Sequence, residues 1–253
     1  MRKEAERFAD GTLFEGMVSL RTVLSDGAKR QIKTVFIDEA KTKKKAKELS
    51  YIKAKSYELG YNIEYLPTEK FEEMVTGTSH GGIAALCTER VIPSLSKEDI
   101  KPKGFYVMVE GIEDPYNFGY ALRSLYAAGV DGIILTERNW MSAAGTVCRA
   151  SAGASELFDV YVSTPEDAVT TFKNAGYSVV GADIANSSSV YESELKYPLF
   201  LIVGGEKRGI SAAILERCDK IVRLDYGREC PFALSAASAA SILGFEIMRQ
   251  NKN

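Results

Sequence analysis

Three polar side chains in the C-terminal half of the chain lie in or beside glycine-rich segments. Asn117 and Arg123 belong to the first segment, and Glu206 lies inside the second one, residues 204–209. Glycine lets the backbone approach a bound ligand closely, because it has no side chain. Asn117 and Arg123 are six residues apart, so they cannot share one helical face. We therefore expect Asn117 to act from the start of a helix and Arg123 from its body.

Two common nucleotide-binding patterns are missing from this region. The predicted strand 105–109 is followed by Glu-Gly-Ile-Glu-Asp-Pro, which is not the G-x-G-x-x-G fingerprint of dinucleotide-binding folds. The second segment reads Gly-Gly-Glu-Lys-Arg-Gly and lacks the Lys-Ser/Thr pair that ends a Walker phosphate loop. The residues alone therefore indicate an α/β enzyme with a ligand at the strand ends, and they leave the ligand open.

Strands and helices alternate from Gly104 onward, which predicts a parallel sheet with helices on both faces. In such sheets ligands bind at the carboxyl ends of the strands, and both glycine segments fall there. The predicted strands cover 105–109, 132–135, 158–162, 177–182, 199–203 and 220–224, and the predicted helices cover 117–128, 142–149, 165–174, 211–217 and 234–249.

The first part of the chain reads as a smaller α/β unit. Two prolines and several lysines between residues 91 and 103 indicate a linker. We therefore divide the chain into an N-terminal domain over 1–95, a linker over 96–103 and a C-terminal domain over 104–253. In the N-terminal domain we expect helices over 17–24 and 43–59, strands over 34–37, 62–66 and 83–87, and a short helix over 71–75 that Thr68 caps.

Composition excludes several classes of protein. The 253 residues are 45% hydrophobic and 26% charged, as in soluble globular proteins, and no apolar run is long enough to span a membrane. The first ten residues lack the apolar core of a secretory signal, so we expect a cytoplasmic protein. The four cysteines are scattered, so no metal site is expected. A single histidine, His80, excludes a mechanism that needs two imidazoles.

Charge is distributed unevenly although the net charge is only −2. Residues 1–103 contain 19 Lys+Arg and 16 Asp+Glu, a balance of +3, and the remainder contains 13 and 18, a balance of −5. The basic excess is concentrated in the lysines of residues 41–47, which could neutralise phosphates. The alternative interpretation is a solvated helix start without a partner.

The motifs together resemble the SpoU (TrmH) family of RNA ribose 2′-O-methyltransferases, in the knotted SPOUT class. The resemblance rests on the segment carrying Asn117 and Arg123, on residues 204–209, and on Ala-Leu-Ser-Ala-Ala at 233–237. The turn at residues 79–83 is similar to one in the L30e-like substrate-binding domain that precedes many such catalytic domains. The resemblance implies S-adenosylmethionine as cofactor, RNA, and ribosomal RNA in particular, as substrate, a C-terminal trefoil knot, and a homodimer through the C-terminal domain.

The resemblance also implies roles for individual residues. Arg123 would hold a phosphate and stabilise the alkoxide that develops on the ribose, because its pKa makes it a poor base. Glu206 would organise that arginine and the ribose, while the small residues at 149–154 would serve packing. The implied catalytic residues are Asn117, Arg123, Glu206 and Ser235; the implied cofactor contacts are Ala182, Val203, Gly204, Gly205, Gly209, Leu224 and Leu234; the implied RNA contacts are Lys43, Lys44, Lys45 and His80.

The chain departs from the family pattern at two places. Ser235 replaces an asparagine, which removes the paired donor and acceptor of an amide, and alanines replace two serines of the same motif. Gly81 replaces a glutamine in the N-terminal turn. Two alternatives therefore stay open: an RNA-binding protein of the same fold that has lost turnover, and a methyltransferase that acts on a nucleobase or a small molecule.

Overall fold

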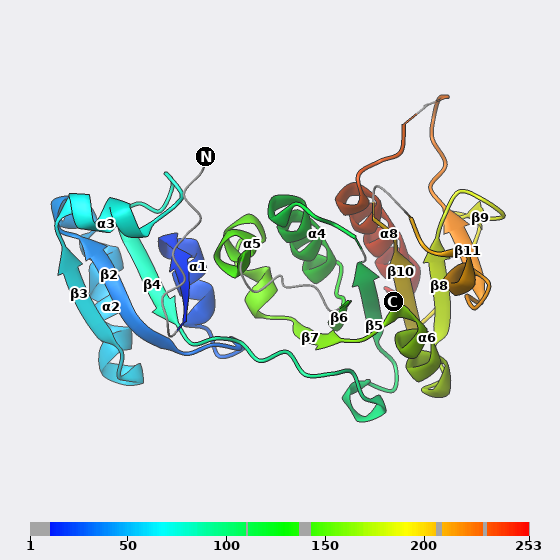
Figure 1. Cartoon of the computed structure of the whole chain (residues 1–253), viewed down its shortest axis with the longest axis horizontal. Helices are drawn as coiled ribbons and strands as arrows, with labels where there is room; N and C mark the ends of the chain where they lie inside the picture. Colours follow the sequence, from blue (N-terminus) through cyan, green and yellow to red (C-terminus); the bar gives the residue numbers. More distant parts are fainter. Residues whose placement is uncertain (1–10, 110, 137–142, 206–208, 230–231, 253) are drawn as a thin grey trace. The chain divides into compact units, whose positions relative to one another are not determined.

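The computed structural model describes residues 11–109, 111–136, 143–205, 209–229 and 232–252. The chain forms two compact units (Figure 1). Unit 1 contains residues 1–91 together with 140–157, and unit 2 contains residues 92–139 together with 158–253. A stretch from the middle of the sequence is therefore part of the N-terminal unit.

Unit 1 is built on a four-stranded sheet with the strand order β1-β4-β2-β3. β4 runs antiparallel to β1 and β2, whereas β3 runs parallel to β2. The described elements of this unit are β1 Thr12–Glu15, α1 Gly16–Val23, β2 Ile32–Asp38, η1 Glu39–Lys44, α2 Ala46–Leu59, β3 Asn62–Leu66, α3 Thr68–Met74, β4 Ile83–Cys87, α5 Ala144–Ala150 and η4 Ala154–Glu156, where η marks a 3-10 helix.

Three features of unit 1 differ from the sequence-based expectations. β1 was not predicted, because four residues are too few to show an alternation. The helix expected over 43–59 begins at Ala46; Lys43 and Lys44 lie in η1, and Lys45 stands between the two helices. The expectation that Thr68 caps its helix is wrong: α3 begins at Thr68 without a side-chain cap, and the Thr68 hydroxyl instead donates to Asp38 Oδ1 at 2.8 Å.

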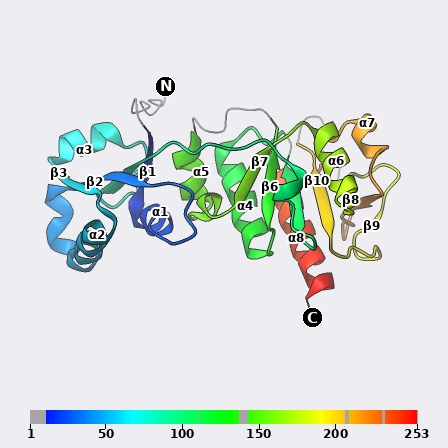
Figure 2. The same ribbon diagram turned by 90° about the horizontal axis from the view of Figure 1, so that it is seen from below.

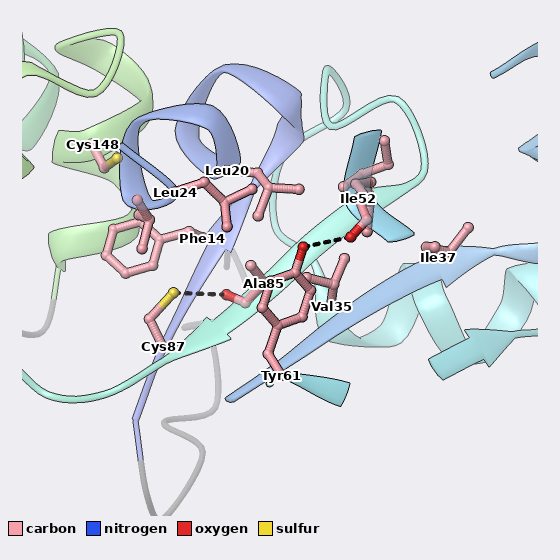
Figure 3. Packing of buried hydrophobic residues seen from close by; sticks show 12 residues of the cluster. Phe14, Leu20, Leu24, Val35, Ile37, Ile52, Tyr61, Ala85, Cys87 and Cys148 are labelled. Atoms are coloured by element: carbon pink, nitrogen blue, oxygen red, sulfur yellow. Dashed lines mark hydrogen bonds between the residues drawn. The ribbon is translucent and has the colours of Figure 1, made fainter. Parts of the chain in front are cut away.

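The core of unit 1 includes a side chain from far along the chain. Cys148 of α5 is fully buried in the same apolar cluster as Phe14, Leu20 and Ile52 (Figure 3). Burial raises the pKa of the Cys148 thiol to about 12. The thiol therefore stays protonated and packs as a small apolar group.

Unit 2 is built on a seven-stranded sheet with the order β7-β6-β5-β10-β8-β11-β9, in which every pairing of described strands is parallel. Helices cover both faces: Figure 2 shows α4 and α8 on one side and α6 and α7 on the other. Its elements are η2 Lys97–Asp99, β5 Phe105–Val109, α4 Pro115–Ala127, β6 Gly132–Leu135, β7 Asp159–Val162, α6 Pro165–Asn174, β8 Ser178–Ala182, β9 Ser188–Ser189, β10 Leu199–Val203, α7 Ala212–Leu215, β11 Lys220–Arg223 and α8 Ala236–Asn251.

The parallel strands are buried on both faces, as their near-continuous apolar sequences require. All five residues of β5 and of β10 are buried. The chain leaves β5 toward β6 on one side and leaves β10 toward β11 on the other. A topological switch point therefore lies between β5 and β10, the place where open α/β sheets bind ligands.

The described residues show neither a membrane-spanning helix nor a cluster of metal ligands. None of the helices in the described ranges is long and apolar enough to cross a membrane. Likewise, those ranges contain no group of three or more His, Cys, Asp or Glu side chains arranged to hold a metal ion.

Candidate functional site

The carboxyl ends of four strands lie in one row. Val203 at the end of β10 pairs with Val109 of β5 on one side and with Ala182 of β8 on the other. Ala182 in turn pairs with Val222 of β11. The segments that follow these residues therefore leave the sheet at one edge, and Leu224 comes directly after β11.

Two glycine turns meet at the switch point of that edge. An added Cβ at Gly205 would lie 2.6 Å from the carbonyl oxygen of Gly111, and one at Gly204 would strike the backbone of Gly209 and Ile210. Gly209 has a φ of +60° and donates its N–H to the Gly205 oxygen at 2.9 Å. Each turn therefore requires glycine, and together they form a cradle of backbone groups that suits the close approach of a nucleoside ligand.

The helix α4 starts directly after the first of these turns. Asp114 caps it, because its Oδ1 accepts the Asn117 N–H at 2.9 Å, and Pro115 occupies the first helical position. The side chain of Asn117 is half-buried in the first turn of the helix. The cap uses the backbone N–H of Asn117, and no hydrogen bond of its side-chain amide is found among the described residues.

Arg123 lies in the body of α4 and is exposed. It follows Tyr116 and Tyr120 by seven and three residues, so the three side chains share one stripe of the helix. Both tyrosines are exposed as well. Asn117 and Arg123 therefore occupy different faces of α4, as the sequence predicted, and no salt bridge of Arg123 is found within the described parts of the chain.

The third motif starts the helix α8. Ser235 is the N-cap residue, and its Oγ accepts the Ser238 N–H at 3.2 Å. The preceding residue, Leu234, donates its N–H to the Tyr226 hydroxyl at 3.1 Å. The serine that replaces the family's asparagine thus has a capping function of its own.

Asp183 is a candidate ligand contact that the sequence did not single out. It follows Ala182, its Oδ1 accepts the Ala185 N–H at 2.9 Å, and its Oδ2 lies 3.8 Å from the Cβ position of Gly209. The sequence could have indicated Asp183, because it is a carboxylate directly after a predicted strand and ligands of such sheets bind at the strand ends.

The lysine cluster of unit 1 divides into engaged and exposed members. Lys41 Nζ lies 3.3 Å from both Asp38 Oδ2 and Glu72 Oε1. Burial alone would raise the pKa of Asp38, but hydrogen bonds from Thr68 and Ala40 and the Lys41 ammonium lower it. In contrast, the neighbouring Lys43 and Lys44 of η1 are exposed, and Lys45, which follows, is partly exposed.

His80 lies in the turn before β4 and is buried, with only 3% of its surface exposed. Its Nδ1 accepts the Gly82 N–H at 3.0 Å, its Nε2 lies 3.5 Å from Glu72 Oε2, and its ring packs against Phe71. The imidazole therefore holds the turn together from within. Its contact with RNA stays a prediction.

Family comparisons identify both parts of the chain. A sequence model described as the SpoU rRNA Methylase family matches residues 104–245, and one described as RNA 2'-O ribose methyltransferase substrate binding matches residues 14–91. The chain belongs to the SpoU rRNA methylase family. The same relationship appears in the Bacillus subtilis (strain 168) protein named "Putative TrmH family tRNA/rRNA methyltransferase YacO", which is 28% identical over 236 residues, or 91% of this chain and 92% of that protein.

Solved structures of SpoU-type enzymes share this fold. The AdoMet-bound rRNA methyltransferase from Sinorhizobium meliloti has a TM-score of 0.78 at 21% identity and covers 95% of this chain and 87% of its own. The SpoU methyltransferase AviRb from Streptomyces viridochromogenes has a TM-score of 0.78 at 19% identity, covering 96% and 90%. The predicted α/β fold, with a small N-terminal domain and a mostly parallel sheet, is confirmed.

The SpoU-family fold gathers some of the predicted site residues and leaves others apart. Glu206 lies outside the described residues. The lysines and His80 belong to unit 1. Ala182 and Val203 end adjacent strands, Gly204, Gly205 and Leu224 follow strands at the same sheet edge, and Gly209 is bonded to Gly205 there. These are the predicted cofactor contacts that the fold brings to one edge.

Proposed function

We propose that this SpoU-family protein transfers a methyl group from S-adenosylmethionine to a ribose 2′-hydroxyl of RNA, with ribosomal RNA as the substrate class. The crossing of the two glycine turns at the switch point, directly before α4, carries this proposal. It offers a backbone cradle for the adenosyl group next to the helix that bears Asn117 and Arg123. The S. meliloti and AviRb structures that share the fold include forms with bound AdoMet.

The residues divide the work between binding and charge stabilisation. Bound S-adenosylmethionine supplies a methyl group on a positively charged sulfur. Backbone groups of Gly204, Gly205 and Gly209 hold the adenosyl portion. The exposed guanidinium of Arg123 holds the phosphate beside the reacting ribose and stabilises the negative charge that develops on the 2′-oxygen. The guanidinium of Arg123 is always protonated, so it does not take the proton. That proton passes from the 2′-hydroxyl to water, and S-adenosylhomocysteine is the leaving group. The amide of Asn117 orients the ribose from the first turn of α4.

Unit 1 supplies the RNA grip in this proposal. It matches the substrate-binding model of the family, and its exposed Lys43 and Lys44 are free of the carboxylates that engage Lys41. Each phosphate that such a lysine neutralises releases counterions, which makes the affinity dependent on salt. Curated relatives are named for both tRNA and rRNA, so transfer RNA is the competing substrate in the test below.

A second copy of this chain is the proposed partner of unit 2. α4 and α8 pack together where Gly244 lies against Leu125, and both helices expose apolar side chains. Tyr120 is 53% exposed on α4, and Phe245 is 43% exposed on α8. Exposed apolar side chains on two packed helices are typical of an association site. Light scattering should give twice the mass of one chain, and Phe245→Glu should give a monomer; a monomeric parent protein would refute the dimer.

The trefoil knot implied by the family also stays a proposal.

Two measurements test the function. Calorimetry should detect binding of S-adenosylhomocysteine and no comparable binding of NAD. The protein should then transfer labelled methyl groups from S-adenosylmethionine to ribosomal RNA transcribed in vitro. A methylated 2′-oxygen cannot attack the adjacent phosphate, so the labelled position should resist alkaline hydrolysis. Label on a base, whose linkage remains cleavable, would refute the ribose assignment, and preferential labelling of transfer RNA would refute the substrate class.

An RNA-binding protein without turnover is the second candidate. It is favoured by one observation: the Ser235 hydroxyl is occupied in capping α8, at the position where the family has an amide. Asparagine is an equally good N-cap, so Ser235→Asn should keep the helix and restore the amide. Methyl transfer that occurs only in Ser235→Asn would establish the second candidate, whereas transfer by the parent chain would exclude it.

A further inference from the structure

The connection between β6 and β7 passes through the other unit of the chain. These two strands are parallel neighbours in the sheet of unit 2, with Ile134 paired to Tyr161. The helix of their crossover, α5, and the following η4 belong to unit 1. β6 also pairs with β5, Ile134 lying opposite Met108, so the crossover leaves from the same sheet edge as the turn that leads into α4.

Two ion pairs fasten this crossover within unit 1. Arg149 Nη1 lies 2.5 Å from Glu15 Oε2, and the Glu15 carboxylate also accepts the N–H groups of Thr76 at 2.7 Å and Gly77 at 2.9 Å. A carboxylate with this many donors has one defined position, so it fixes the direction of the Arg149 side chain. An added Cβ at Gly77 would displace the Arg149 guanidinium and the Glu15 carboxylate, so the pair lies directly against this part of the backbone.

The second ion pair is almost completely buried. Arg30 Nε lies 2.7 Å from Glu156 Oε2, with 1% and 4% of the two side chains exposed. Arg30 also donates to the Thr88 oxygen at 2.9 Å, and Lys29 N–H donates to the Glu156 oxygen at 3.2 Å. Removal of one partner would leave a buried charge uncompensated, which strongly disfavours any arrangement without Glu156 in place.

Close packing of the backbone also holds this segment against unit 1. An added Cβ would strike the Leu13 oxygen if placed on Gly145 and the Thr22 side chain if placed on Gly153. The small residues at 149–154, which the sequence assigned to packing, therefore pack against unit 1, and Cys148 enters its core (Figure 3). The segment 143–157 is thus held by charge, by close backbone contact and by burial together.

We propose that residues 143–157 couple the substrate-binding unit to the reacting edge, with Arg149 and Glu156 as positioning residues. The inference rests on the proposed function. The chain leaves β6 at the sheet edge of the α4 turn and returns to the sheet at β7 only after the segment anchored in unit 1, so the backbone links RNA binding by unit 1 to that edge. The coupling should affect the rate of methyl transfer to RNA and should not affect the affinity for the cofactor.

Hydrogen exchange of the full chain tests the attachment directly. Peptides covering 144–150 should gain protection with ribosomal RNA transcribed in vitro, together with peptides covering 83–87. S-adenosylhomocysteine should protect peptides covering 199–203 and leave 144–150 unchanged, because a ligand stabilises the cooperative unit that binds it. Protection of 144–150 by S-adenosylhomocysteine would overturn the proposal.

Enzyme kinetics test the positioning role. Arg149→Met should keep the affinity for S-adenosylhomocysteine and for RNA within about twofold and lower kcat on RNA by about 10- to 100-fold, the scale of a misplaced reactant. Arg149→Lys should retain most of the turnover. The matched control is Lys173→Met, which removes an ion pair to Asp219 at 2.7 Å inside unit 2 and should leave kcat unchanged. An unchanged kcat in Arg149→Met would refute the coupling, whether or not the parent enzyme methylates ribose.

Discussion

Arg123 combines two properties that a charge-stabilising side chain needs. It is rooted in a helix whose start is fixed by the Asp114 cap and Pro115, and its guanidinium is exposed rather than buried in the core. Its neighbours on the same stripe, Tyr116 and Tyr120, are exposed on the face that we assign to the dimer. Under the two proposals above, RNA and a second copy of the chain would both approach α4 at this stripe.

Replacement of Arg123 by alanine should abolish most of the methyl transfer without affecting the cofactor. Loss of one preorganised donor that stabilises a developing charge lowers the rate about 10²- to 10³-fold. Calorimetry with S-adenosylhomocysteine should give the parental affinity, and single-turnover methylation of ribosomal RNA should give the reduced rate. Arg217→Ala, which removes a partly exposed arginine bonded to Thr170, is the control. Full activity in Arg123→Ala would mean that the role of the arginine is misassigned.

The glycine turns make an element-scale prediction about the reacting edge. Gly205→Ala would place a Cβ 2.6 Å from the Gly111 oxygen, so the two turns would have to separate. We expect a loss of about 1–3 kcal/mol in the free energy of unfolding, typical of overpacking, and a loss of S-adenosylhomocysteine binding of more than about tenfold. Denaturant titration and calorimetry measure the two effects.

Gly27→Ala is the matched control for that change. An added Cβ there would make an ordinary contact, 3.6 Å from a methyl group of Leu157, and Gly27 belongs to the other unit. Its effect on unfolding should stay within about 0.5 kcal/mol, as for most surface changes. Equal cofactor binding in Gly205→Ala and Gly27→Ala would mean that the crossing of the turns does not shape the site.

The last turns of α8 predict a pH dependence. Two hydrogen bonds of 2.8 Å from Arg249 and one from Gln250 reach the Glu246 carboxylate, and the Arg249 interaction is the main cause of its lowered pKa. A carboxylate whose pKa is lower in the folded state stabilises the fold above its unfolded pKa, about 4.3. That contribution is lost as the pH falls through the folded pKa.

Glu246→Gln should therefore be less stable than the parent chain at pH 7, by about 1 kcal/mol. The difference should shrink as the pH falls below the ordinary glutamate range, because protonation removes the charge from the parent as well. Denaturant unfolding at a series of pH values measures it. A difference that grew toward acid would contradict the sign of the argument.

The helices and strands of unit 2 could be predicted from the sequence, but the order of the strands in the sheet could not. Buried parallel strands such as 199–203 are continuous apolar runs, and the glycines after them indicate turns, so the sheet edge that we propose for the ligand could be predicted. The pairing of Ala182 with both Val203 and Val222 could not, because strand order depends on contacts between residues far apart. Asp183 was missed for the same reason: its significance lies in the proximity of Gly209.

Unit 1 shows the same limit more sharply. The sequence predicts a helix over 142–149, but it contains no information about which core Cys148 enters. His80 presents a similar case, since a histidine in a turn suggests an accessible contact and the fold buries it against Phe71. Periodicity reports that a side chain is buried, and only tertiary structure identifies its partners.

At the scale of the whole molecule, unit 1 is not one continuous stretch of the sequence, because residues 140–157 belong to it. A fragment of residues 11–95 lacks Cys148 and Glu156, so it exposes part of its apolar cluster and leaves Arg30 without its partner. Breaking a buried ion pair by removing one member costs about 3–5 kcal/mol, which is a large part of the stability of a small domain.

We therefore expect the 11–95 fragment to unfold at a lower denaturant concentration than unit 1 does in the full chain, or to lack a cooperative transition. A peptide of residues 143–157 added in trans should raise the midpoint. The same peptide with Glu156→Gln, which keeps its size but loses the charge, should raise it less. A fragment as stable as the intact unit, and indifferent to both peptides, would show that the segment is dispensable for the fold.

The pair between Arg30 and Glu156 also sets an order of events during translation. Domains are expected to fold one after another as the ribosome releases them, beginning with the first. Here the guanidinium of Arg30 has no ion-pair partner until the Glu156 carboxylate is synthesised, 126 residues later. At about 5–20 residues per second, that interval lasts roughly 6–25 seconds. During it, the nascent N-terminal segment carries an unfinished core, and both units can be completed only after the crossover has been made.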